Sequence, residues 1–286
     1  MTLKDEKLYY VGGVVRDEIL NRPSVDVDYC YEGNAIEFAQ KFDIIRTNLD
    51  FGTVKVRYEG KDIDIASTRK EVYPRKGHLP KVLQIGCSLE EDLKRRDFTI
   101  NALAKRTTDG EIIDLYNGKK DLENKILRVL HKESFIDDPT RIIRGLKFAV
   151  RFGFKLDEGT KRLQDEYLSN INYDMCYHRL KKELVETFNL NREEAFREFV
   201  ASGMYKLLGE NQEKPKLDYS FEKIINSYPC KHVWLMYLFM FDLSNLELTR
   251  AEKRVLEWFE RLKTEKPTNN TPYESILMHK IYKGSL

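Results

Sequence analysis

The sequence predicts an α+β fold, in which a small mixed sheet forms an N-terminal head and helices form the rest of the chain. Before Glu90, short stretches of alternating and β-branched residues are separated by turns, whereas from Glu90 onward the apolar residues recur almost entirely at helical spacing. The 286 residues also exceed the roughly 150 residues of one typical domain. We therefore expect a sheet-bearing head that is joined to a helical part.

The first expected elements are a strand at residues 7–11, a tight turn at Gly12 and Gly13, and a helix at 14–20. Glycine adopts positive φ and has no Cβ, so both glycines suit a turn that a ligand approaches closely. The free N–H groups and the positive dipole end of the helix face this turn, which is an arrangement that binds phosphate. An ordinary glycine turn is the alternative.

The second expected strand, at residues 25–31, carries two carboxylates one residue apart. Asp26 and Asp28 leave the same face of this strand, and Val27 is expected to face the core. Two like charges side by side are stable when a divalent cation lies between them, and oxygen ligands favour Mg²⁺ over Zn²⁺. Combined with the glycine turn, the pair indicates nucleotidyl transfer; a polar strand end is the alternative for the pair alone.

The remaining head elements follow from local signals. A helix is expected at 34–42 with Asn34 as its N-cap, and a hairpin of residues 53–58 and 62–66 is expected around Glu59-Gly60. Both predictions rest on residue types that favour a particular backbone geometry.

Asp62 and Asp64 share one face of the second hairpin strand. Asp64 is either a third carboxylate near the metal ions or part of a solvent-facing polar row. The sequence does not decide between these two interpretations.

A second cluster of charged residues occupies residues 93–103. Three consecutive cations precede Asp97, which is expected to cap a following helix, and Arg95 or Arg96 is suited to hold a triphosphate by charge-assisted hydrogen bonds. Asn101 lies four residues after Asp97, so these two side chains are expected on one helix face. A charged helix start without a ligand is the alternative.

A third cluster begins at Asp138, which is followed by Pro139. Asp at the N-cap and Pro at the first helical position predict a helix that continues to Gly153. Asp138, Arg141 and Arg144 are three residues apart and lie on one side of this helix. An N-cap aspartate and surface arginines are the alternative for each residue alone.

Composition favours an intracellular protein and says little about partners. The 49 Lys+Arg nearly balance the 47 Asp+Glu, so the net charge of +2 does not by itself indicate a polyanion partner. The four cysteines lie far apart without a CxxC pair, which favours free thiols in a reducing cytoplasm. No secretion signal is visible, and the longest apolar run, 233–241, is shorter than the ~20 residues of a membrane helix, so we expect a buried helix there.

Four motifs, in this order, resemble those of the class II tRNA nucleotidyltransferases, the superfamily of the CCA-adding enzymes and bacterial poly(A) polymerases. They are Gly-Gly-x-Val-Arg-Asp from Gly12, Asp-x-Asp from Asp26, Arg-Arg-Asp-Phe-Thr-x-Asn-Ala from Arg95, and Asp-x-x-Arg from Asp138. Residues 114–128 resemble the connector of that family, and 179–183 resembles its later Arg-x-x-x-Glu motif. The resemblance covers roughly residues 8 to 190.

The resemblance implies a polymerase-beta-like nucleotidyltransferase head at 1–132, a helical neck that recognises the base at 133–190, and a short helical body or tail that binds tRNA at 191–286. Asp26 and Asp28 would be the catalytic residues and would bind two Mg²⁺ ions. One ion would activate the tRNA 3′-hydroxyl and the other would hold the triphosphate, so that in-line attack expels pyrophosphate.

The resemblance also implies the residues that bind the incoming nucleotide. Those of the head are Gly12, Gly13, Arg16, Arg96, Asp97 and Asn101. In the neck, Asp138 and Arg141 would read the base and Arg144 would support them.

The base-reading pair has a chemical rationale of its own. Cytosine and adenine both present an amino donor beside a ring-nitrogen acceptor, which match an aspartate that only accepts and an arginine that only donates. Guanine and uracil present the reverse order, and the unpaired buried groups can discriminate by factors as large as ~10⁴. The pair therefore predicts use of CTP and ATP without a nucleic-acid template.

Residues 68–80 look like a flexible loop that family members specialised for CC addition tend to lack. This favours full CCA addition to the tRNA 3′ end, with A-only addition as the main alternative. A poly(A) polymerase, a nucleotidyltransferase for another acceptor and a non-catalytic RNA-binding relative are less favoured. No membrane partner is indicated, and no protein partner can be inferred.

Two residues depart from the family pattern: Lys147 stands where arginine is more common, and His178 where an acidic residue is expected. The 191–286 segment is short for a body and tail, which leaves open how tRNA is anchored. Candidate phosphate-tracking cations are Lys181 and Lys182 beside Arg179, Lys147 with Arg151, and Lys214 with Lys216. Solvated helix faces are the alternative for all of them.

Overall fold

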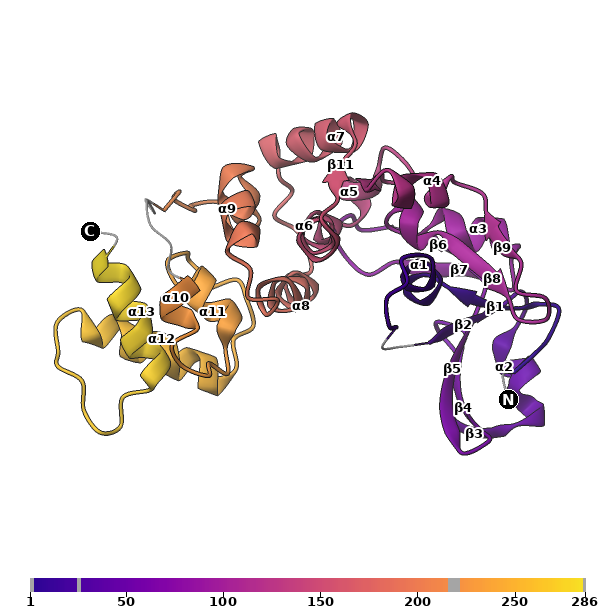
Figure 1. The fold of residues 1–286 in the computed structure, drawn as a ribbon, viewed down its shortest axis with the longest axis horizontal. Helices are drawn as coiled ribbons and strands as arrows, with labels where there is room; N and C mark the ends of the chain where they lie inside the picture. The colour runs from indigo at the N-terminus through magenta and orange to yellow at the C-terminus, as the bar shows by residue number, and fades with distance from the viewer. Residues whose placement is uncertain (1–2, 25–26, 216–221, 285–286) are drawn as a thin grey trace. The chain divides into compact units, whose positions relative to one another are not determined.

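The computed structural model describes residues 3–24, 27–215 and 222–284. The chain divides into two compact units (Figure 1). We call Met1–Asp137 with Phe154–Lys161 the head unit, and Asp138–Gly153 with Arg162–Leu286 the helical unit.

The head unit contains a seven-stranded sheet in the order β3-β4-β5-β2-β1-β8-β9. Strands β2 and β5 are parallel and the other neighbouring pairs are antiparallel, so the predicted mixed sheet is confirmed. The strands are β1 (Leu8–Val11), β2 (Asp28–Tyr31), β3 (Asp43–Asn48), β4 (Thr53–Tyr58), β5 (Lys61–Ser67), β8 (Leu103–Arg106) and β9 (Ile112–Asp114).

Apolar side chains cover both faces of this sheet because successive strand residues point to opposite sides. On one face, Leu8 and Tyr29 pack with Ala35 of α2 (Ala35–Phe38) and Ala39 of the short 3₁₀ helix η1 (Ala39–Lys41). On the other face, strand residues such as Cys30 pack against α3 (Leu89–Lys94). Two buried clusters, one on each face, thus hold the sheet in place.

Two local predictions in the head are confirmed. Residues Glu59 and Gly60, with φ values of 49° and 76°, form the turn between β4 and β5, as expected of a two-residue hairpin loop. The side chain of Asn34 accepts a hydrogen bond from the backbone N of Ile36 (3.1 Å) and so caps α2.

The expectation of almost purely helical structure after Glu90 was wrong. Strands β8 and β9 extend the sheet beyond β1, and β10 (Ile126–Leu127) pairs in parallel with β11 (Lys155–Leu156). These strands have two to four residues, too few for a period of two to be recognised, and their pairing with distant segments holds them in place.

The expected flexible loop at 68–80 also contains regular structure. Strands β6 (Arg69–Val72) and β7 (Lys81–Ile85) form an antiparallel hairpin. At its tip, Lys76 Nζ lies 2.5 Å from Asp137 Oδ1, and the Gly77 N–H donates to the Asp137 carbonyl (3.0 Å). The hairpin is therefore held by contacts at its strands and at its tip.

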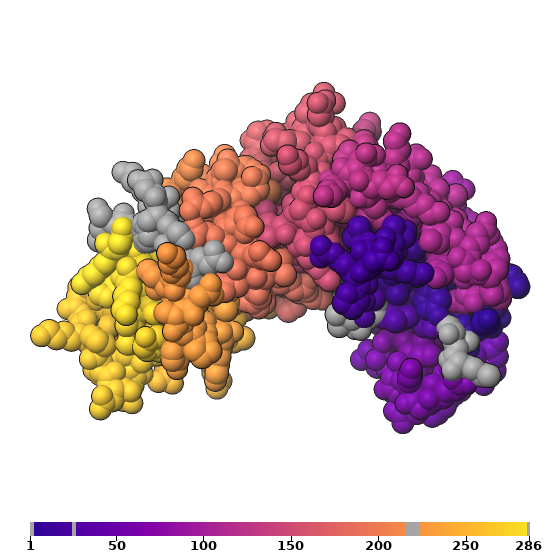
Figure 2. Space-filling view, in the orientation of Figure 1, coloured from indigo at the N-terminus to yellow at the C-terminus, as the bar shows by residue number. Residues whose placement is uncertain are grey.

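The head unit is completed by short helices: α1 (Gly13–Ile19), η2 (Thr99–Asn101), α4 (Gly118–Glu123) and α5 (Ser134–Asp137). The segment that contains α1 reaches the surface in the face shown in Figure 2 (indigo). Helix α7 (Glu158–Ser169) spans the boundary between the two units.

The helical unit packs an amphipathic helix, α6 (Thr140–Phe152), against α8 (Tyr177–Phe188) and α9 (Glu193–Ala201). Its other helices are η3 (Met204–Leu208), α10 (Glu222–Ile225), α11 (Val233–Leu238), α12 (Arg250–Leu262) and α13 (Tyr273–Gly284). Gly153 ends α6 in the left-handed conformation (φ 73°), as the sequence predicts.

Aromatic packing fills the centre of the helical unit. Phe188 of α8 contacts Phe199 of α9 edge-on at 5.3 Å between ring centroids, and it stacks on Tyr237 of α11 at 5.6 Å. The buried helix expected at 233–241 is confirmed for Val233–Leu238, which form α11. Within the described ranges, no helix is long and apolar enough to cross a membrane.

Candidate functional site

The glycine turn lies between β1 and α1, and it needs glycine for two reasons. Gly12 has a φ of 69°, and a Cβ built on it would lie 2.9 Å from Nη1 of Arg96. Its N–H donates to the carbonyl of Leu103 (3.1 Å), which ties the turn to β8. The helix begins at Gly13, one residue before the predicted start. The turn thus brings the backbone of Gly12 next to an arginine that is far away in sequence.

Arg16, Asn101 and Asp97 form a buried chain of hydrogen bonds behind this turn. Arg16 Nη1 donates to Asn101 Oδ1 (2.6 Å), and Asn101 Nδ2 donates to Asp97 Oδ1 (2.9 Å). The predicted proximity of Asp97 and Asn101 is therefore a direct contact. Asp97 is not a helix N-cap as expected, because Phe98 precedes the short helix η2; Asp97 accepts from the Phe98 N–H instead (2.7 Å).

Arg96 connects this chain to α3. Its Nη1 donates to the Asn101 carbonyl (3.4 Å) and its Nη2 to Asp92 Oδ2 (3.2 Å). Its Nε is buried and has no hydrogen-bond partner among the described residues. An unsatisfied buried donor costs ~1–3 kcal/mol, which an anionic acceptor would offset. Of the two arginines proposed to hold a triphosphate, Arg96 has this open donor, whereas Arg95 binds Asp92 and Glu71.

Of the predicted metal pair, Asp26 lies outside the described residues. Asp28 is the first residue of β2 and its side chain is exposed. Val27 is 47% exposed, so the expectation that it faces the core was wrong: the strand begins one residue later, and Val27 takes no part in its alternation.

The strand register places Asp64 directly beside Asp28. These residues are partners in the parallel pair β2–β5, and Lys55 of β4 is the partner of Asp64 on its other side. Lys55 Nζ lies 2.9 Å from Asp64 Oδ2 and offsets part of the repulsion between the two carboxylates. All three side chains line an open hollow of about 930 Å³.

Oxygen donors on an open sheet edge fit a hard divalent cation such as Mg²⁺. In the described part of the chain, however, no three His, Cys, Asp or Glu side chains form a metal-binding group. Asp26 is outside that part, and the role of Asp64 stays a prediction.

The base-reading residues predicted in α6 lie together in the helical unit. Asp138 and Arg141 are both buried, and Arg141 Nε is 4.0 Å from Asp138 Oδ2. The helix starts at Thr140 with Pro139 at the N-cap position, one residue later than predicted. Asp138 still acts as a cap, because its Oδ1 accepts from the backbone N (3.2 Å) and the hydroxyl (2.6 Å) of Thr140.

Helix α8 binds both Asp138, which precedes α6, and cationic side chains further along α6. The sequence did not reveal that role of α8. Arg179 Nη2 donates to Asp138 Oδ2. Glu183, one turn later on the same face, accepts from Arg144 (3.0 Å) and from Lys147 (2.7 Å). The Arg-x-x-x-Glu spacing was the available signal, but only the packing of α8 on α6 shows which residues it serves.

The two residues that depart from the family pattern have different environments. Lys147 is largely buried and binds both Glu183 and Glu186. Burial would raise the pKa of Glu186, but the hydrogen bond and charge of Lys147 lower it below its usual value. His178 is exposed, with Nδ1 3.3 Å from Glu247 Oε2. Lys147 therefore forms ion pairs with two glutamates of α8, whereas His178 lies at the surface.

Some of the candidate RNA-binding cations are already paired. Lys181 Nζ donates to Glu252 Oε2 (2.6 Å) and to the Glu247 carbonyl (2.7 Å), which opposes a role in tracking phosphates. The same holds for Lys147. Lys216 lies outside the described residues, whereas Lys182 and Lys214 are exposed. The cysteines are free thiols, as predicted.

The comparisons with known proteins agree with these motifs. Residues 8–128 match the family model of the poly A polymerase head domain. The chain is 35% identical over 270 residues to the A-adding tRNA nucleotidyltransferase of Aquifex aeolicus, which covers 86% of this chain and 32% of the relative. It is 36% identical over 203 residues to the CCA-adding enzyme of Lactobacillus delbrueckii subsp. bulgaricus, which covers 68% and 50%.

A solved structure of a CCA-adding enzyme in an apo form matches with a TM-score of 0.78 at 27% identity and covers 96% of this chain and 75% of that chain. The chain spans about a third to a half of the length of these two curated relatives. The likeness to the solved structure confirms the α+β fold predicted from the sequence.

Proposed function

We propose that the chain, whose residues 8–128 match the family model of the poly A polymerase head domain, adds CCA to the 3′ end of tRNA, with CTP and ATP as substrates. The observation that carries the proposal is the meeting of two features at one edge of the sheet. Strand β1 ends there in the glycine turn, and the antiparallel strand β2 begins there with Asp28. A nucleotidyltransferase needs a phosphate-binding turn next to metal-binding carboxylates.

Asp26 and Asp28 would hold Mg²⁺, and Asp64, which is the strand partner of Asp28, would assist them. When bound, the metal ions supply activation of the 3′-hydroxyl and charge neutralisation at the triphosphate. The protein residues position the nucleotide: Arg16 is fixed by Asn101, and Arg96 offers its open Nε donor near Gly12. We propose that these groups bind the triphosphate.

Base selection is assigned to Asp138 and Arg141. The carboxylate of Asp138 accepts hydrogen bonds, and the guanidinium of Arg179 donates one to its Oδ2. Arg141 only donates. The pair therefore matches cytosine and adenine and opposes guanine and uracil. We propose that the chain divides into a head (1–132), a neck (133–190) and a tRNA-binding body (191–286).

A-only addition is the second candidate, favoured by the name of the Aquifex aeolicus relative. That relative and the CCA-adding one are almost equally identical to this chain, so identity does not choose between them. The two activities share the chemistry of the head and differ in whether CTP is accepted.

The test uses three tRNA transcripts that end before CCA, after C and after CC. Each is incubated with Mg²⁺ and one or more labelled nucleotides, and products are resolved at single-nucleotide length. Two C and one A added to the shortest transcript support CCA addition. ATP used only on the CC-ended transcript makes the protein an A-adding enzyme, and long A tails make it a poly(A) polymerase.

The Asp28→Ala variant should abolish incorporation, while Asp43→Ala is the matched control. Asp43 is an exposed carboxylate at the start of the edge strand β3. Absence of incorporation by the unaltered protein, with tRNA still bound, would contradict the enzyme proposal and leave an RNA-binding relative.

A further inference from the structure

Among the described residues of the head, Asp92 is the most enclosed carboxylate, and it binds three different partners. The residue is 0% exposed. Its Oδ1 accepts from Arg95 (Nε 3.0 Å, Nη2 2.8 Å) and from the backbone N of Arg69 (3.1 Å), and its Oδ2 accepts from Arg96 Nη2 (3.2 Å). One side chain of α3 thus contacts the first residue of β6 and the arginine beside the glycine turn.

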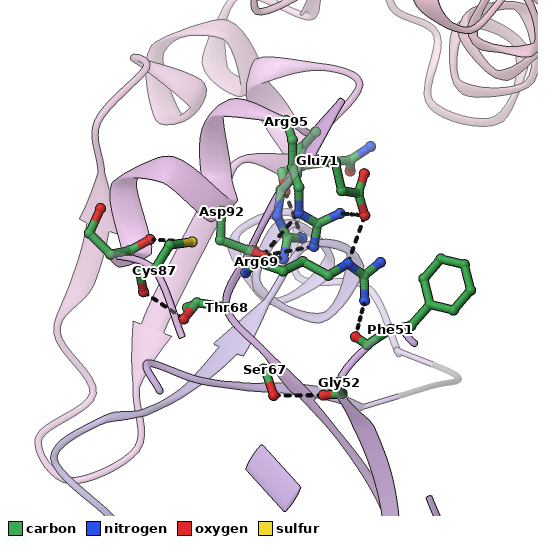
Figure 3. A network of polar contacts seen from close by, with 12 residues as sticks. Phe51, Gly52, Ser67, Thr68, Arg69, Glu71, Cys87, Asp92 and Arg95 are labelled. Carbon is green, nitrogen blue, oxygen red and sulfur yellow. Dashed lines mark hydrogen bonds and ion pairs between the residues drawn. The ribbon is translucent and has the colours of Figure 1, made fainter. Parts of the chain in front are cut away.

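Glu71 of β6 adds a second link between the hairpin and α3. Its Oε1 accepts from Arg69 Nε (2.7 Å) and from Arg95 Nη1 (3.1 Å), and its side chain is nearly buried. Figure 3 shows Arg69, Glu71, Asp92 and Arg95 converging, with Arg69 also reaching the Phe51 carbonyl. We call Arg69, Glu71, Asp92, Arg95 and Arg96 the Asp92 network.

The Asp92 network has an unbalanced charge, and Arg96 is its member next to the glycine turn. The Asp92 network contains three guanidinium groups and two carboxylates, so it carries one excess positive charge. Arg96 is the member whose Nη1 lies 2.9 Å from the position of a Cβ added to Gly12, and whose buried Nε has no hydrogen-bond partner among the described residues. An anion that binds at Arg96 would neutralise the excess charge.

We infer that Asp92 is a positioning residue, which holds the Arg96 guanidinium at the glycine turn and couples it to the order of the β6–β7 hairpin. The inference rests on the proposed function, because it takes Arg96 as a ligand of the nucleotide triphosphate. Arg95, the C-cap residue of α3, donates both to Asp92 and to Glu71 and so links Asp92 to the hairpin. By linkage, a triphosphate that orders Arg96 should also stabilise the hairpin, and loosening the hairpin should weaken triphosphate binding.

The first experiment measures equilibrium binding of ATP and AMP by calorimetry in the full chain. The Asp92→Asn variant keeps the size of the side chain and removes its charge. We expect it to weaken ATP binding by about tenfold, which corresponds to ~1.4 kcal/mol, and to leave AMP binding unchanged. Glu111→Gln is the matched control, because Glu111 is an ion-paired head carboxylate whose partner is Arg106.

The second experiment measures hydrogen exchange of the hairpin amides with and without ATP. In the unaltered protein ATP should slow exchange in β6 and β7. Glu71→Gln, which leaves the Asp92–Arg96 contact in place, should reduce that protection and weaken ATP binding by a smaller factor than Asp92→Asn. If Asp92→Asn does not fold, Glu71→Gln alone carries the test.

Equal loss of ATP and AMP affinity in Asp92→Asn, or hairpin exchange that ATP does not change, would overturn the inference and leave Asp92 a structural residue. Nucleotide addition to tRNA is scored separately. An unaltered protein that adds nucleotides while Asp92→Asn binds ATP normally would refute the inference and keep the proposed function. If Asp92→Asn selectively loses ATP binding but the unaltered protein adds no nucleotide to tRNA, the inference about Asp92 is kept and the proposed function is refuted.

Discussion

Gly12 is the residue at which one added carbon should disturb the head site most. We expect Gly12→Ala to lower the free energy of unfolding by about 1–2 kcal/mol, because its left-handed φ disfavours a Cβ. It should also weaken ATP binding, since the new Cβ would displace Arg96. Denaturant titration and calorimetry measure the two effects.

Gly60→Ala is the matched control for Gly12→Ala. Gly60 has a similar φ of 76°, but an added Cβ there meets nothing within 4 Å. A comparable loss of stability with normal ATP binding is expected. Equal loss of ATP binding in both variants would show that backbone strain, and not the contact with Arg96, causes the effect.

Arg179 donates a hydrogen bond to Oδ2 of Asp138, and we expect it to help orient that carboxylate. We expect Arg179→Ala to lower the preference for CTP over UTP by about tenfold, in line with ~1.5 kcal/mol for a hydrogen bond to a charged group. The measurement compares kcat/KM for the two nucleotides on one tRNA transcript. Lys182→Ala, which removes an exposed cation of the same helix, should leave the preference unchanged; an equal fall in both variants would contradict this role.

At the scale of elements, α12 illustrates how local sequence stabilises a helix. Thr249 accepts from the backbone N of Glu252 (3.3 Å), and Glu252 accepts from the backbone N of Thr249 (2.7 Å), which makes a capping box. We expect Thr249→Ala to lower the free energy of unfolding by ~1 kcal/mol and Thr249→Ser to be nearly neutral. Urea titration measures both, and equal stability of the two variants would show that the cap contributes nothing.

Short strands are the elements for which local sequence was insufficient. Strand β8 has four residues and lies between β1 and β9, and the hairpin strands β6 and β7 have four and five. Segments of this length satisfy several patterns, so tertiary pairing decides their conformation. By contrast, the β4–β5 hairpin was predictable because Glu59-Gly60 favours positive φ at both turn positions.

At the scale of the whole molecule, paired carboxylates in both units should make stability depend on acid pH. Burial alone would raise the pKa of Asp92 and of Glu252. The charges of Arg96 and Arg95 lower the pKa of Asp92 below its usual 3.8, and the hydrogen bond from Lys181 lowers that of Glu252 below 4.5. Lowered native pKa values mean that the unfolded chain takes up protons first.

We therefore expect stability from these groups to be fully present above about pH 4.5 and to fall as the pH drops through their lowered native pKa values. Thermal unfolding between pH 6 and pH 3 measures this. Glu252→Gln should reduce the fall of the melting temperature between pH 6 and pH 3. Glu265→Gln, which removes an exposed carboxylate, should leave that fall unchanged. An unchanged slope in Glu252→Gln would contradict the assignment.

Site residues could be predicted where a motif is compact. The structure brings Gly12, Arg16, Arg96, Asp97 and Asn101 into one largely buried group, although Arg16 and Asn101 are 85 residues apart in the chain, and their role in nucleotide binding stays a prediction. It also brings Asp138 next to Arg141. Asp26 lies outside the described residues, so the metal pair stays a prediction.

The sequence by itself determined the features that arise from near neighbours: the glycine turn, the Asn34 cap, the β4–β5 turn and the end of α6 at Gly153. Only the tertiary structure decided that Asp64 lies beside Asp28, that Arg179 binds Asp138, and that Asp92 joins the β6–β7 hairpin to Arg96. The physical reason is that these contacts join segments far apart in the chain, 41 residues for Arg179 and Asp138. Their register and burial come from packing of whole elements, which no local periodicity encodes.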